Sequence, residues 1–188
     1  EAWREEYLRD IMAPLVLPKA RELITSHEAR GHVTAIVTAA NSFLTGPISR
    51  MFGVGHLLAS DPEIVDGEFT GKIDGIACFH EGKIAKLEGW LEGRGQALSD
   101  FRESYFYGDS QSDVPLMEKV THPVAVGDDE TLGRIAREAS SRTGAPAAAV
   151  QVEGQDGVSA RGSFGDPPRH ELLHGPLAAN PDVYRAVT

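Results

Sequence analysis

Two aspartates stand four positions apart in the stretch YFYGDSQSDVPLM, residues 105–117. Asp109 and Asp113 follow an aromatic, strand-like run that stops at Gly108, and only polar residues separate them. If that run is a strand of an open α/β sheet, both carboxylates lie at its carboxyl end, where such sheets bind ligands. Oxygen-rich sites with a few carboxylates suit Mg²⁺. A structural alternative is that Asp113 caps a helix beginning near Pro115, because Asp is a favourable N-cap and Pro a favourable first-turn residue.

Two other positions could handle a phosphate. Thr38 ends a predicted buried strand and precedes the small residues Ala39 and Ala40, so a hydroxyl and backbone N–H groups could meet an anion there. Lys83 opens a predicted helix after a turn, where its ammonium could neutralise a phosphate as a point charge. Each is ordinary when taken singly, because threonine is common in strands and lysine on surfaces.

The elements that must position these residues alternate between helix and strand. Apolar runs bounded by turn residues predict strands, and apolar residues at helical spacing predict helices. The predicted strands are 33–41, 56–59, 104–108 and 123–127, and the predicted helices are 18–30, 47–52, 81–91 and 128–140. The pair Asp66-Gly67, between two alternating runs, predicts a small hairpin. This order favours an α/β fold with a parallel sheet.

Three segments divide the chain. Residues 1–17 begin with a predicted amphipathic helix that ends before Pro14, and its stripe of Trp3, Tyr7 and Ile11 is expected to pack into a core. Residues 18–140 carry the α/β pattern. From residue 141 to 188 no period of 2 or 3.6 persists, and glycine, proline and alanine dominate, so we expect a linker-like or disordered tail there.

The composition narrows the classes of partner. A formal charge of −10 argues against nucleic acid and against an anionic membrane surface, which leaves small molecules. No apolar run is long enough to span a bilayer, and the acidic start has no secretory signal pattern. The single cysteine, Cys78, suits a reducing compartment and reads as a small core residue, so the cytoplasm is the expected location.

The three candidate motifs occur in a family-specific order. Thr38 in AIVTAAN, Lys83 in EGKIAKL and the aspartates in YGDSQSD resemble the second, third and fourth motifs of the haloacid dehalogenase-like hydrolases. The resemblance extends over residues 1 to about 139. It is strongest to the phosphoserine phosphatase-like branch, because the segment FTGKIDG is similar to the hairpin of that branch. It implies a Rossmann-like parallel sheet with a small β-hairpin, preceded by the remnant of a helical cap.

The resemblance also implies roles for individual residues. Thr38, with Ala39 and Asn41 beside it, would bind the phosphoryl group of a small phosphorylated substrate, and Lys83 would steady the phosphate. Asp109 would bind Mg²⁺, and Asp113 would support it. Lys86 is a less well spaced substitute for Lys83. Ser112 departs from the family, which usually has Asn there. This departure weakens the inference that the residues around Asp109 support a metal ion.

The largest departure is an absence. The family's first motif, Asp-x-Asp-x-Thr, supplies the nucleophile from a central strand, and no such sequence precedes Thr38. Asp10 lies in a predicted helix and is no substitute. We therefore expect an N-terminally truncated piece of a phosphatase, with two unpaired central strand edges and a tail that resembles a shifted reading frame. The alternative is a non-catalytic fragment that binds phosphate or metal.

A competing motif lies in the tail. HELLH, residues 170–174, matches a zinc peptidase signature in which His170 and His174 bind the metal and Glu171 is the base. Prolines on both sides leave less than two helical turns, and no third ligand follows. We therefore favour an incidental pair of histidines over a zinc site.

Overall fold

The computed structural model describes residues 2–16, 18–127, 129–144, 148–153 and 157–159. The described chain divides into two compact units, one ending at Arg94 and the other beginning at Gly95. Parallel strand pairs occur in both units, so the predicted α/β class is confirmed. Among the described residues, every helix is too short or too polar to span a bilayer.

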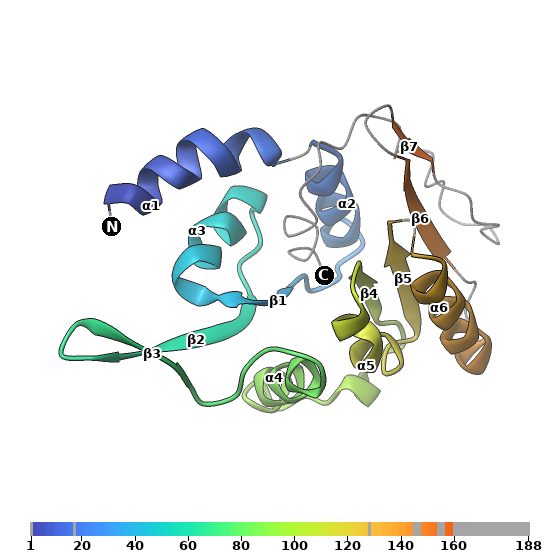
Figure 1. The fold of residues 1–188 in the computed structure, drawn as a ribbon. Coiled ribbons are helices and arrows are strands. Elements are labelled where there is room, and N and C mark those ends of the chain that lie inside the picture. The colour runs from blue at the N-terminus through green and yellow to red at the C-terminus, as the bar shows by residue number, and fades with distance from the viewer. Residues whose placement is uncertain (1, 17, 128, 145–147, 154–156, 160–188) are drawn as a thin grey trace. The chain divides into compact units, whose positions relative to one another are not determined.

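The first unit holds a three-stranded sheet and most of the helices (Figure 1). Its elements are α1 (Ala2–Tyr7), a π-helical turn (Leu8–Met12), a 3₁₀ turn (Ala13–Leu15), α2 (Pro18–Glu28), β1 (Ile36–Asn41), α3 (Ser42–Phe52), β2 (Leu57–Val65), β3 (Glu68–Asp74) and α4 (Glu81–Glu92). β1 and β2 are parallel, and β2 continues into an antiparallel hairpin with β3. The hairpin turns at Asp66 and Gly67, whose φ angles are 52° and 83°, as the Asp-Gly pair predicts.

The second unit holds a four-stranded sheet in the order β4-β5-β6-β7. Its elements are a 3₁₀ turn (Leu98–Asp100), β4 (Tyr105–Gly108), a 3₁₀ turn (Gln111–Asp113), α5 (Val114–Met117), β5 (His122–Val126), α6 (Glu130–Thr143), β6 (Ala148–Glu153) and β7 (Gly157–Ser159). β4, β5 and β6 run parallel. α6 buries Leu132, Ala136 and Ala139 on one face, in line with its sequence period.

Two sequence predictions about helices are wrong. α3 begins at Ser42 and not at Pro47, because the Asn41 side chain accepts a hydrogen bond from the Leu44 amide and starts the helix earlier. The stripe of Trp3 and Ile11 is not core, since these side chains are 59% and 51% exposed. The π-helical turn is wider than an α-helical turn and rotates the buried face, so that Leu8 and Met12 are buried instead.

Strands also occur beyond the predicted end of the regular structure. β6 and β7 lie within 141–188, the segment expected to be linker-like, and β6 pairs with β5. Residues 160–188, which include His170, Glu171 and His174, lie outside the described residues. In the described part of the chain, β1 pairs only with β2, and β4 only with β5. The division into cap remnant, core without its first strand, and tail stays a prediction.

Candidate functional site

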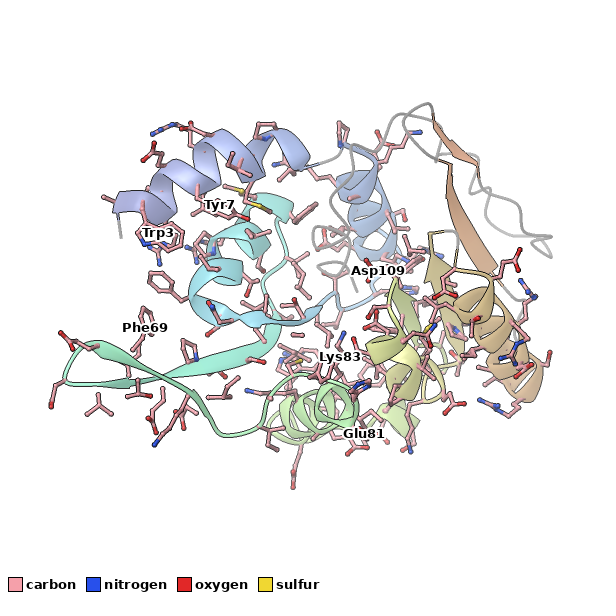
Figure 2. All side chains as sticks on the ribbon, viewed as in Figure 1. Trp3, Tyr7, Phe69, Glu81, Lys83 and Asp109 are labelled. Atoms are coloured by element: carbon pink, nitrogen blue, oxygen red, sulfur yellow. The ribbon has the colours of Figure 1, made fainter. Side chains whose placement is uncertain are left out.

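The turn after β4 is organised by the carboxylate of Asp113. Its Oδ2 atom accepts hydrogen bonds from the Asp109 amide at 3.1 Å, the Ser110 amide at 3.0 Å and the Ser110 hydroxyl at 3.1 Å. Asp113 is only 2% exposed. Because one buried oxygen closes the whole turn, the position of Asp109 at the end of β4 is fixed by Asp113 (Figure 2 shows Asp109).

Gly108 makes this turn sterically feasible. A Cβ atom at position 108 would lie 2.8 Å from the Cβ and 3.1 Å from the Oδ2 of Asp113, which is closer than side chains pack. The glycine between the aromatic strand and Asp109 therefore lets the two aspartates approach. Asp113 occupies the N-cap position of α5, as the structural alternative predicts, but its side chain makes no capping hydrogen bond there and closes the preceding 3₁₀ turn instead.

The other side chains of the turn contact each other and the next helix. The hydroxyls of Ser110 and Ser112 are 2.7 Å apart, and Gln111 Nε2 donates to Asp129 Oδ2 at 2.8 Å. Asp129 caps α6 by accepting from the Thr131 and Leu132 amides. The Leu132 amide, followed by Gln111, lowers the pKa of Asp129. The turn is thus connected to α6 by a hydrogen bond. Ser112, which departs from the family pattern, makes its contact with Ser110 inside the turn.

Thr38 lies where the pairing of β1 with β2 becomes irregular. Val37 pairs with Leu58, but the next pair joins Asn41 to Ser60, so β1 has two extra residues at this point. The Thr38 side chain is buried, and its Oγ1 accepts from the Ala40 amide at 3.2 Å. Such bulges free backbone groups from a sheet and are frequent beside functional sites.

Lys83 is completely buried, with an exposed fraction of 0%, in the first turn of α4 (Figure 2). A fully buried lysine is rare, because its ammonium must leave water, and it is a stronger candidate for function than a surface lysine. α4 contacts both β1, which carries Thr38, and β2. The first unit thus places both candidate phosphate-binding residues on elements that touch.

The loop before α4 fixes the position of Lys83. The Cys78 amide donates to Ser60 Oγ at 2.9 Å, which ties the loop to β2. A Cβ atom at Gly82 would lie 1.9 Å from the carbonyl oxygen of Ala77, so only glycine fits there. Cys78 itself is 0% exposed, in agreement with its reading as a core residue.

Lys86, the possible substitute for Lys83, has a different environment. Its Nζ atom donates to Asp61 Oδ2 at 2.7 Å, and this hydrogen bond lowers the pKa of Asp61. The two residues lie 25 positions apart, so the sequence offered no spacing rule that would have paired them. The ion pair holds α4 against β2 and favours Lys83 as the candidate phosphate ligand.

The sequence-predicted residues fall into two groups. Thr38, Ala39, Asn41 and Lys83 belong to the first unit, and Asp109 and Asp113 to the second. Within the second group the structure brings the two aspartates into one turn.

The donor set of that turn fits Mg²⁺, which binds proteins through one or two carboxylates and completes its shell with water and phosphate. Asp109 would be the ligand and Asp113 its support, because Asp113 Oδ2 already accepts three hydrogen bonds. In the part of the chain described, no three His, Cys, Asp or Glu side chains form a metal-binding group.

Comparisons with known proteins identify the family. A sequence model of the haloacid dehalogenase-like hydrolases matches residues 1–118. The chain is 34% identical over 137 residues to a histidinol-phosphatase of Neisseria meningitidis, covering 72% of this chain and 62% of that protein. It is 31% identical over 134 residues to a phosphoserine phosphatase of Mycobacterium tuberculosis, covering 71% of this chain and 42% of that protein.

A solved structure agrees with the fold. It is a protein of unknown function from Bordetella pertussis, 50% identical, with a TM-score of 0.70 over 73% of this chain and 61% of the other. The chain spans about half the length of the curated relatives it matches, between 42% and 62% for the two above. Since the family model covers more than half of the sequence, the chain belongs to the haloacid dehalogenase-like hydrolase family.

Proposed function

We propose that this chain is part of a Mg²⁺-dependent phosphomonoesterase that acts on a small phosphorylated substrate in the cytoplasm. The observation that carries the proposal is the turn in which Asp113 closes the backbone around Asp109, because it presents one carboxylate at the end of a parallel strand. The phosphatase names of the relatives support the same class of reaction. We also propose the division into a cap remnant at 1–17, a core at 18–140 and a tail at 141–188.

Each candidate residue would make a separate contact with the substrate. Thr38 would donate its hydroxyl to a phosphoryl oxygen, and the backbone amides of the bulge, with Ala39 at its centre, would donate to another. The side-chain oxygen of Asn41 caps α3, and its amide nitrogen would contact the ester group. Lys83 would offset the charge of the phosphate. The attraction between ammonium and phosphate is stronger when both are shielded from water.

The chemistry would run through an aspartyl-phosphate. A carboxylate attacks phosphorus, the bond to the ester oxygen breaks, the released alcohol takes up a proton, and water then hydrolyses the acyl-phosphate. The nucleophile belongs to the family's first motif, which does not occur before Thr38 in this chain. Mg²⁺ held by Asp109 would neutralise phosphoryl oxygens when bound.

Turnover and binding separate the two candidate functions. Because no first motif precedes Thr38, we would join a first-motif segment from a relative to the chain and assay it with an aryl phosphate and Mg²⁺. Binding of Mg²⁺ and phosphate to the chain alone is measured by calorimetry. Turnover that is lost in Asp109→Ala supports the phosphatase. Binding of phosphate and Mg²⁺ without turnover supports the second candidate, a non-catalytic fragment, which the missing first motif favours. If neither ligand binds, both functions are wrong for this chain.

A further inference from the structure

A cavity of about 380 Å³ lies between α4 and β2, within the first unit. Its β2 wall consists of Leu57, Leu58 and Ala59, and Ala85 and Gly89 of α4 face it. The side chains of these two walls are apolar. The volume is at the small end of the range for ligand sites in proteins, about 300–1,000 Å³.

Gly89 has no packing role that explains its presence. It lies in the interior of α4, where glycine destabilises a helix by about 1 kcal/mol relative to alanine. A Cβ atom at position 89 would meet nothing within 4 Å, in contrast to Gly82 in the first turn of the same helix. Gly89 is exposed, and it brings no side chain to its part of the cavity wall.

The cavity has a charged end and an aromatic end. At one end Lys86 Nζ and Asp61 Oδ2 form the ion pair at 2.7 Å, and the side chains are 20% and 51% exposed. At the other end is Trp90, whose ring lies 5.1 Å from that of His56. The Arg94 guanidinium also lies 5.0 Å from the centroid of the Trp90 ring, so the indole has two contacts at this end.

We propose that this cavity binds a free α-amino acid with an apolar side chain. The carboxylate would accept hydrogen bonds from Lys86, and the ammonium would donate to the half-exposed carboxylate of Asp61. The side chain would lie against Leu58 and Trp90, in the space that Gly89 leaves. A lone carboxylate or a lone amine is a poorer match, because each would satisfy one charge of the pair and approach the like charge of the other.

Trp90 gives a direct readout. The sequence has two tryptophans, so a Trp3→Phe variant of the full chain leaves Trp90 as the only indole. We would titrate this variant with L-leucine and follow the emission of Trp90. We expect a saturable change, and at least tenfold weaker binding in Gly89→Leu, whose side chain fills the cavity, and in Lys86→Met.

Two half-ligands and a folding control complete the test. Isovalerate and isoamylamine, each carrying one charge, should bind at least tenfold more weakly than leucine. Circular dichroism checks that Gly89→Leu remains folded, and Gly89→Ala, which adds one methyl group, should bind with intermediate affinity. No saturable change with leucine, equal binding of isovalerate, or unchanged binding in both Gly89→Leu and Lys86→Met would overturn the proposal.

Discussion

The backbone amide of Asp109 donates to the carboxylate of Asp113 at 3.1 Å, so the candidate metal ligand is held by the other aspartate of its own motif. The side chain of Asp109 stays half-buried at the end of β4, whereas that of Asp113 is buried inside the turn. The two carboxylates are therefore not equivalent. Asp109 is the candidate ligand for a cation, and Asp113 determines the position of Asp109.

Asp113→Ala should destabilise the protein by about 1–3 kcal/mol, because the amides of Asp109 and Ser110 lose their buried acceptor. Urea unfolding measures this loss. Asp113→Asn, which keeps one carbonyl oxygen, should lose less stability. We expect Mg²⁺ binding to weaken in the same order. Equal stability of the alanine variant and the parent would show that Asp113 does not hold the turn.

Gly108→Ala should destabilise by about 1–3 kcal/mol, since its methyl group would meet Asp113 Cβ at 2.8 Å and force the turn apart. Gly89→Ala is the matched control, because the added methyl there meets open space and should stabilise α4 by about 1 kcal/mol. Both values come from chemical denaturation. If the two substitutions shift stability in the same direction, the close approach at Gly108 has no energetic effect.

Lys83→Met should weaken binding of inorganic phosphate by about 10- to 100-fold, as expected for the loss of a charged hydrogen bond. Urea unfolding of Lys83→Met is measured alongside, so that a loss of folding of this fully buried position is not mistaken for the loss of a phosphate ligand. Lys86→Met is the paired control, and its phosphate affinity should stay within about threefold of the parent. Calorimetry with phosphate distinguishes the two lysines, and a larger loss in Lys86→Met would reverse the assignment.

His122 should make the protein less stable as the pH falls below about 6.5, the ordinary pKa of the imidazole. Burial lowers the pKa of His122 in the folded protein, and the nearby carboxylate of Glu103 opposes this only in part. The unfolded chain therefore takes up the proton first, and stability falls until the pH drops below the folded pKa. The ring also stacks on Tyr105, with centroids 4.3 Å apart.

The variant His122→Gln tests this cause. The parent should lose stability between pH 7.5 and pH 5.5 in urea unfolding, and the variant should lose less over the same interval. The variant Asp129→Asn is a useful comparison, since the pKa of Asp129 is lowered from its already acidic ordinary value. Between pH 7.5 and pH 5.5 its loss of stability should match that of the parent, because Asp129 takes up a proton only below about pH 4. Identical pH profiles for the parent and His122→Gln would exclude His122 as the titrating group.

The sequence predicted the parts of this structure that depend on neighbouring residues. The hairpin at Asp66-Gly67 follows from a local backbone preference, and α6 from a helical period, and both are confirmed. The apolar stripe of the first helix was misread, because nothing in its spacing announces the π-helical turn that follows Tyr7. Element type was thus easier to predict than the face that an element buries.

The candidate site was predictable to a similar degree. The spacing of Asp109 and Asp113 predicts that both lie in one turn. It does not predict that a single oxygen of Asp113 accepts three hydrogen bonds. Contacts between residues distant in the sequence, such as Cys78 with Ser60 and Lys86 with Asp61, were out of reach. These contacts depend on the tertiary register of strand and helix, which no local pattern encodes.

The contact between Gly82 and the carbonyl of Ala77 limits how this region can change in length. A helix advances about 1.5 Å and turns about 100° with each residue. Deleting one residue between Cys78, which is anchored to β2, and the start of α4 would therefore rotate Lys83 by more than a quarter of a circle. The number of residues in this loop therefore determines the direction of the Lys83 side chain. Relatives that use this lysine in the same way should tolerate substitutions in the loop more readily than insertions or deletions.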